Sequence, residues 1–516
     1  MSEAAREVAT IAAALAVLGL LLPLPRLRSE AQRAAAMAVL LASWAVMLGT
    51  LVPADDARDG LDRLASPLVA AGAPAVLIAA IALFVIGVRV VLARPTVWFV
   101  LLGIALPIRI SVSFGSQEGN LLVPLYGVIL LGLAAFAWGR VRGRLDRPAP
   151  EGPAALNVPL AALVAYFLVS SLWSADPEEA AVKAGFFFIP FTVLYLLVVA
   201  WWPRARALAA LAVTTIAGAV VAAGVALWQY AAQEIWWNET LQQANVYSRF
   251  FRVNGIFFDP NILGRYLAIG ILAALALAWV RRRPAELAAL GAAVAVMAAG
   301  MVVTFSRSSS LMLMVGLVIL AVRAVGPLRA AIGGAALLVV LGGAAVAASG
   351  NVRRAVTDAD RLERVSEGRF DLMEGGLDIW REEPVTGIGL GGFERRFEET
   401  LTPLEQQRVR VVVSHNAPIT VLSETGIVGS ALFLALIAGA GWAVVRGSRE
   451  EGEVGWARWA LGAMLAGILV HSLLYAALFE DPFTWVIAGA AVALVGTRPV
   501  AVTAPQPVRP EPVPVS

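Results

Sequence analysis

The chain has 516 residues, of which 59% are hydrophobic and only 15% are charged. Soluble domains carry about 25% charged residues, so this composition excludes an ordinary soluble protein. The net charge of +3 comes mostly from arginines in short loops and does not indicate a nucleic-acid partner. The absence of Cys excludes disulfides and thiolate metal sites, and two distant histidines do not suggest a zinc site. We therefore expect no metal and no cofactor.

Continuous apolar runs near the length of a membrane span predict an all-α polytopic membrane protein, because barrel strands would alternate instead. We expect about 12–15 transmembrane helices, and the first and last candidates are the weakest. The candidate spans are 8–24, 34–53, 68–93, 96–114, 120–138, 155–173, 185–202, 207–230, 261–280, 286–304, 309–325, 328–349, 416–445, 457–479 and 482–497.

Loop charges predict the orientation of these spans. Arginines cluster in every second loop, for example at 140–147 and 281–283, whereas acidic residues occupy opposite loops such as 55–62 and 480–481. The positive-inside rule places the arginine loops in the cytoplasm. Fifteen spans put the N-terminus outside, and one fewer early span would put it inside.

Two outer segments, 231–260 and 350–415, are too long to be simple turns. In the second, apolar residues recur at helical spacing between 362 and 380 and again between 393 and 404, which predicts two or three amphipathic helices. The glycine-rich stretch 387–392 between them is interpreted as a turn, because no strand precedes it and no P-loop lysine follows it.

The chain is predicted to have four parts. We expect N-terminal transmembrane helices at 1–349, a helical extracytoplasmic loop at 350–415, C-terminal transmembrane helices at 416–497 and a disordered Pro-rich tail at 498–516.

Four arginines lie on the predicted outer side: Arg249 and Arg252 in the outer segment, Arg307 between two spans, and Arg265 just inside the span that follows the outer segment. Guanidinium groups stay charged and bind phosphate in a two-pronged way, so this set suits an anionic, lipid-borne phosphate. Two plainer interpretations remain open: Arg265 could snorkel to the headgroups, and Arg307 could be a turn residue.

His415 lies where the outer segment meets an apolar run, and neutral imidazole accepts a proton near pH 7. Asn416 follows it, and Glu424 lies in the third turn of the next helix, where it could pair with an arginine or be a satisfied structural partner. A helix-terminal histidine without a chemical task is the alternative for His415. His471, inside the following span, is interpreted as a core residue.

These residues resemble a known family. His415-Asn416 followed by Gly426 and Gly429 resembles the signature of the O-antigen ligase and polymerase superfamily. Arg252 through Asn261, the turn at Thr304–Arg307, and Gly368-Arg369 with the stretch 380–393 are similar to further elements of that family. The resemblance covers about residues 160–490.

The resemblance implies a membrane glycosyltransferase of the GT-C type, inverting and metal-independent, in the bacterial cytoplasmic membrane with its active site facing the periplasm or cell exterior. Such enzymes transfer a glycan from a polyprenyl (undecaprenyl) diphosphate to a glycan or glycolipid acceptor. Carried over to this chain, His415 is the catalytic base and Arg252 and Arg307 bind the diphosphate, with Arg249 and Arg369 as possible helpers.

Two rival functions remain open at this point. A polymerase of the same superfamily differs from a ligase only in its acceptor, and nothing in the sequence decides between them. A transporter of lipid-linked oligosaccharides would need polar residues near mid-membrane and often has internal repeats. Here the polar residues gather at outer helix ends and no repeat is visible.

Overall fold

The computed structural model describes residues 3–22, 30–51, 67–114, 117–142, 154–201, 205–248, 250–330, 332–333, 369–402, 414–446 and 451–495. The expected span at 328–349 and the tail at 498–516 lie wholly or largely outside these residues.

The N-terminal half is helical apart from one hairpin. Its elements are α1 (Glu3–Leu21), α2 (Glu30–Leu51), α4 (Pro67–Ala93), α5 (Thr96–Ala105), β1 (Ile110–Phe114), β2 (Gln117–Leu121), α6 (Val123–Val141), α7 (Ala154–Ser170), the 3-10 turn η1 (Ser171–Trp173), α8 (Pro177–Lys183), the π-helical turn η2 (Ala184–Phe188), α9 (Ile189–Trp201), α10 (Ala205–Ala232) and α11 (Glu239–Tyr247).

The C-terminal half is helical throughout its described residues. Its elements are α12 (Pro260–Val280), α13 (Pro284–Thr304), α14 (Arg307–Val325), α18 (Arg369–Glu382), α19 (Phe393–Thr400), α21 (Ala417–Arg446), α22 (Gly452–Ser472) and α23 (Pro482–Val495).

Among the described residues, 12 helices are long and apolar enough to cross a membrane. This confirms the predicted polytopic bundle. The amphipathic helices expected in the segment 350–415 are also present, as α18 and α19. Two further apolar helices, α5 and α23, are shorter than a span.

The prediction of a continuous span at 96–114 was wrong. The helix ends at Ala105, and the chain then forms an antiparallel hairpin in which Ile110 pairs with Leu121. Pro107 cannot continue a helix, and the alternation of apolar residues with serines from Ile110 to Phe114 has the period of a strand. Hydropathy averaged over a window of this length does not show the change from helical to strand spacing.

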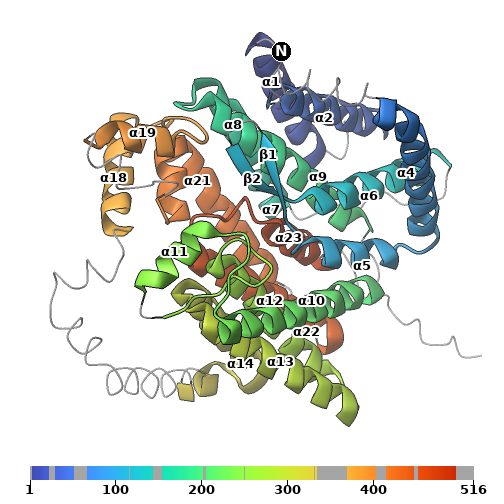
Figure 1. Ribbon diagram of the computed structural model, residues 1–516, viewed down its shortest axis with the longest axis vertical. Coiled ribbons are helices and arrows are strands. Elements are labelled where there is room, and N and C mark those ends of the chain that lie inside the picture. The colour runs from blue at the N-terminus through green and yellow to red at the C-terminus, as the bar shows by residue number, and fades with distance from the viewer. Residues whose placement is uncertain are drawn as a thin grey trace, which may run out of the picture.

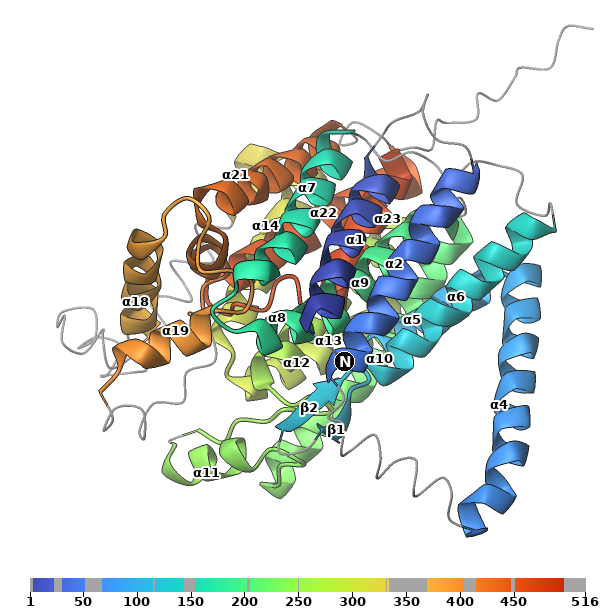
Figure 2. The ribbon, with the colours of Figure 1, turned by 90° about the horizontal axis from the view of Figure 1, so that it is seen from above.

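The elements outside the bundle gather at one end of it. Figure 2 shows α11, α18, α19 and the β1–β2 hairpin at this end, whereas α4 stands at the far side of the bundle and packs on α5 and α6. In both views α18 and α19 lie beside α21 (Figures 1 and 2). The start of α1 lies at the same end, because Glu3 and Arg6 border a small hollow with Ser171 and Pro177. We call this the α11 end.

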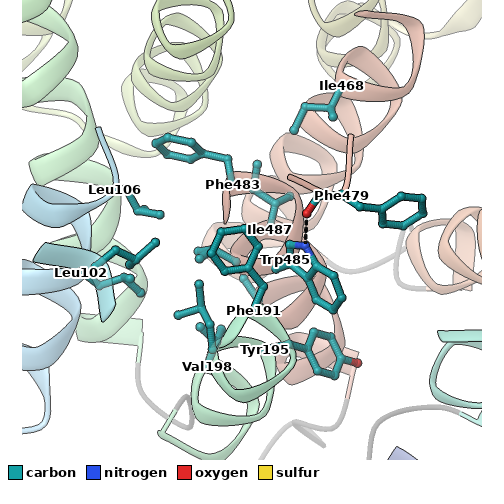
Figure 3. Packing of buried hydrophobic residues seen from close by; sticks show 14 of the residues in the cluster. Leu102, Leu106, Phe191, Tyr195, Val198, Ile468, Phe479, Phe483, Trp485 and Ile487 are labelled. Carbon is teal, nitrogen blue, oxygen red and sulfur yellow. Dashed lines mark hydrogen bonds between the residues drawn. The ribbon is translucent and has the colours of Figure 1, made fainter. Parts of the chain in front are cut away.

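The short helix α23 is a centre of the apolar core rather than a surface element. Figure 3 shows Phe483, Trp485 and Ile487 of α23 facing Phe191 of α9, with Leu102 of α5 opposite. The Trp485 indole donates a hydrogen bond of 2.8 Å to the Phe479 carbonyl, so its one polar group is satisfied inside the core. This packing buries the first turn of α23, although the helix is shorter than a membrane span.

Helix α21 is broken at Gly426, whose backbone has φ 62° and ψ −161°. Backbone groups freed by a break need new partners, because an unsatisfied group in an apolar setting costs several kcal/mol. The loop 384–389 supplies them, and the glycine-rich stretch 387–392 is a turn as expected. The four bonds are Ile427 N to Pro384 O (2.9 Å), Val428 N to Val385 O (3.3 Å), Ile388 N to Ser423 O (3.1 Å) and Gly389 N to Glu424 O (2.8 Å).

We predict that Gly426→Ala destabilises the protein. A Cβ at this position would overlap the Val385 carbonyl, and the backbone conformation itself costs a non-glycine residue about 1–3 kcal/mol. Thermal unfolding in detergent should show a lower midpoint. Gly441→Ala is the matched control on the same helix, because a Cβ there meets nothing within 4 Å. Equal midpoints for the two variants would contradict the role assigned to the break.

Candidate functional site

Arg252 lies against the turn that carries Arg307. The Arg252 Nε donates to the Thr304 carbonyl at 3.2 Å, and Thr304 is the last residue of α13. Phe305 then adopts a left-handed backbone (φ 51°), and Ser306 caps α14, which begins with Arg307. Arg252 is half-buried and Arg307 is exposed. Two of the predicted diphosphate-binding residues are thus brought together at the α11 end.

The backbone of Arg252 is itself held in place. Asn245 of α11 accepts a bond from the Arg252 N–H and donates to the Arg252 carbonyl, both at 2.9 Å. A side-chain amide that grips both backbone groups of one residue fixes its position more firmly than a single bond does. Of the two helper arginines, Arg249 lies outside the described residues, and for Arg369 the structure describes only its place at the start of α18.

Serines at the start of α14 join three helices. Ser306 Oγ donates to Asn261 Oδ1 of α12 at 2.8 Å, and Ser309 Oγ donates to the Asn261 carbonyl at 3.1 Å. Ser308 Oγ lies 3.2 Å from Nε2 of His471 on α22. His471 is fully buried, as expected for a core residue, and its hydrogen bond ties the Arg307 turn to the end of α22.

His415 precedes α21 at the same end of α22. Its backbone is left-handed (φ 55°) and its side chain is half-buried. Asn416 Oδ1 accepts from the Ile419 N–H at 3.1 Å, which caps α21, and Asn416 Nδ2 donates to the Leu473 carbonyl at 3.0 Å. Leu473 directly follows α22 and lies two residues after His471. The His415 loop and the Arg307 turn are therefore fastened to neighbouring points at one helix end.

The left-handed conformation of His415 is stabilised by its neighbours. Ser414 is fully buried; its Oγ accepts from the Asn416 N–H at 3.1 Å and lies 2.7 Å from Thr420 Oγ1. A non-glycine residue with positive φ costs of order 1–3 kcal/mol and persists only where its surroundings determine it. Such strain is common at functional sites.

Glu424 pairs with a lysine, not an arginine. Its Oε1 lies 3.0 Å from the Nζ of Lys183, the single lysine of the chain, and both side chains are buried. This bond links α8 to the part of α21 just before the break. Glu480 lies near the same lysine; burial raises the pKa of its carboxyl above the usual value, and Lys183 opposes that rise.

Arg265 is buried in an ion pair instead of lying at the surface. Its guanidinium contacts Asp481 at 2.6 Å and donates to the Ala477 carbonyl at 2.7 Å, and the side chain is almost fully enclosed. This excludes the snorkelling alternative. Direct contact of Arg265 with a diphosphate stays a prediction.

A second arginine, which the sequence analysis did not single out, faces the same carboxylate. Arg109 precedes β1; burial lowers the pKa of its guanidinium, Asp481 opposes that shift and Arg265 adds to it. The buried carboxyl of Glu480 also interacts with Arg265, so acids and bases alternate in this cluster. In the sequence Arg109 lies between two apolar runs, which could have marked it as a functional candidate. It was missed because 96–114 was predicted as one continuous helix.

Within the described ranges no three side chains of His, Asp or Glu come together in a way that could hold a metal ion. Arg252 and Arg307 at the α11 end carry guanidinium groups, which are suited to bind phosphate oxygens directly.

Together, the apolar helices and the polar groups at one end define a multi-pass membrane protein with a candidate site where its helices begin and end. Residues 292–434 match a family model described as O-antigen ligase. This match supports the resemblance to the O-antigen ligase superfamily that the sequence predicted. The matched region contains Arg307, His415, Asn416 and Glu424. A comparison with curated proteins finds no match for this chain.

We predict that Lys183→Met lowers stability by about 3–5 kcal/mol, because it leaves the Glu424 carboxylate buried without its cation. The double variant Lys183→Met/Glu424→Gln should recover much of that loss, because neither charge then remains. Thermal unfolding of the four proteins of this cycle in detergent measures the coupling. Strictly additive effects of the two substitutions would show that the pair contributes no interaction.

Proposed function

We propose that the protein transfers a glycan from a polyprenyl diphosphate carrier to an acceptor hydroxyl on the outer side of the cytoplasmic membrane, as an O-antigen ligase. The observation that carries the proposal is the attachment of two loops to one helix end. Asn416, beside His415, bonds to Leu473, and His471 bonds to Ser308, beside Arg307. A base and a phosphate-binding cation are the two groups that such a transfer requires.

The proposed reaction inverts the anomeric carbon. His415 takes the proton of the acceptor hydroxyl while that oxygen forms a bond to the anomeric carbon. The bond from this carbon to the diphosphate oxygen breaks, and its electron pair leaves with the diphosphate. Arg252 and Arg307 stabilise the developing negative charge, so the chemistry needs no metal ion. The donor already carries its leaving group, so no nucleotide is consumed.

Arg265, Arg109 and Asp481 have a supporting place in this proposal. The ion pair fixes Arg265 within α12 and ties it to the start of α23. Glu424, paired with Lys183, positions α21 rather than moving a proton.

We predict that His415→Asn folds normally and lowers the transfer rate by about 10²–10⁴-fold, the usual contribution of a positioned base. Asn tolerates the left-handed backbone of this position better than most other non-glycine residues, so the substitution removes the imidazole while keeping the loop. His415→Ala should lose transfer as well. The assay uses purified protein in detergent with lipid-linked glycan donor, and EDTA should leave the wild-type rate unchanged.

The same assay separates the rival functions. A transporter has no activity in detergent, where there are not two compartments. A ligase extends a glycolipid or other acceptor, whereas a polymerase joins two lipid-linked glycans. Full transfer by the His415→Asn protein would remove the assignment of the base.

We predict that the α11 end faces the outside of the cell. The chain has no cysteine, so single cysteines report their own accessibility. Glu383→Cys, in the exposed loop after α18, should react with a membrane-impermeant maleimide in intact spheroplasts. Arg282→Cys, in the arginine-rich connection between α12 and α13, should react only after the membrane is opened. The reverse pattern would place the site in the cytoplasm and contradict the proposed donor.

A further inference from the structure

A hollow of about 520 Å³ lies beside α11 and is not part of the site described above. Its volume is within the range of about 300–1,000 Å³ that is usual for small-molecule sites. The polar residues that line it are three amides and one carboxylate, Gln233, Asn245, Gln242 and Glu234, and Phe251 is among its apolar residues.

The wall of this hollow is fixed by side-chain to backbone bonds. Asn238 caps α11 through Leu241 N at 2.8 Å and also donates to the Phe258 carbonyl at 2.6 Å. Gln242 donates to the Ile235 carbonyl at 2.8 Å. Together with the two Asn245–Arg252 bonds, these bonds hold α11 at its start and towards its end, so the hollow is formed before any ligand arrives.

The polar groups of the hollow offer several acceptor oxygens. One N–H of Gln233 and one of Gln242 donate to the Tyr230 and Ile235 carbonyls, which leaves the side-chain oxygen and one N–H of each amide for a ligand. Glu234 is exposed and forms no ion pair with any residue that the structure describes. Acceptor oxygens beside an apolar ring suit a ligand with many hydroxyl donors and apolar C–H faces, which is the chemistry of a sugar. The carboxylate disfavours an anionic lipid headgroup.

The hollow is directly connected to the candidate site. Asn245, which lines it, grips the Arg252 backbone with two bonds, and Phe251 is the residue before Arg252. A glycan whose diphosphate lies at the Arg252 guanidinium therefore has a sugar-binding surface on the other side of the same residue.

We propose that the hollow beside α11 is a glycan subsite, which binds sugar residues of the donor or of the acceptor while the reaction proceeds at His415. The proposal rests on the proposed function and adds the place where the sugar chain is held. Its bonding groups are the oxygens of Gln233, Gln242 and Glu234, with Phe251 as the apolar surface.

The test fills the hollow. Val246 lines it and is 77% exposed, so Val246→Trp should fold normally while its indole occupies the space. We expect a KM raised roughly tenfold or more for one glycan substrate, equivalent to losing one or two hydrogen bonds. A raised KM for the lipid-linked donor assigns the subsite to the donor, and a raised KM for the acceptor assigns it to the acceptor. Tyr247→Trp is the control, because Tyr247 is 91% exposed and does not line the hollow.

A binding measurement keeps the proposal testable apart from catalysis. Saturation-transfer NMR uses the glycan released by mild acid from the polyprenyl diphosphate lipids of the source cells. The wild type and Tyr247→Trp should transfer saturation to the sugar protons, and Val246→Trp and Glu234→Gln should transfer much less. Unchanged KM values and unchanged saturation in Val246→Trp overturn the subsite, even if His415→Asn abolishes transfer as expected. Transfer that survives in His415→Asn overturns the proposed mechanism, whatever the NMR result.

Discussion

The hydrogen bond from Asn416 to the Leu473 carbonyl is the constraint on which the candidate site depends. Helix ends leave backbone groups without intrahelical partners, and in an apolar surrounding these groups must be satisfied by something nearby. Asn416 meets this need twice, because it caps α21 and also bonds to the residue that follows α22. The same helix end receives Ser308 through His471. Polar groups that satisfy helix ends thereby become the framework that brings His415 and Arg307 into one region.

The break in α21 also positions neighbouring parts of the chain through backbone groups that need partners. An uninterrupted helix would offer the segment 384–389 no free backbone groups, whereas the break at Gly426 offers free amides and carbonyls that this segment can bind. The same loop also binds the connection between η1 and α8, where Ala175 N donates to the Ile388 carbonyl at 2.9 Å. The outer segment with α18 and α19 is thus joined both to the helix that follows His415 and to the connection before α8. A shift of α21 or of α8 would therefore change the position of the loop 384–389.

The fold class could be predicted from the sequence because apolar runs and loop charges are local signals. The closeness of Arg252 to the Arg307 turn followed from the expectation that both lie on the outer side. The partners of the buried charges could not be predicted in this way. Lys183 and Glu424 are 241 residues apart in the sequence. The partner of Arg265 is Asp481, which in the sequence alone belongs to a short acidic loop. The hairpin was missed because Ile110 to Phe114 is apolar enough to pass as the end of a helix.

Arg252 joins the two halves of the proposed substrate site. Its guanidinium contacts the turn that carries Arg307, and its backbone is gripped by Asn245, which lines the hollow beside α11. A ligand that presses on Asn245 therefore acts on the position of the cation that is proposed to bind the diphosphate. Binding energy from sugars far from the reacting bond can in this way improve the fit of the diphosphate, and only such differential binding raises the rate. Under the proposed function, the sugar chain of the donor would thereby position the phosphate without any direct contact between the hollow and His415.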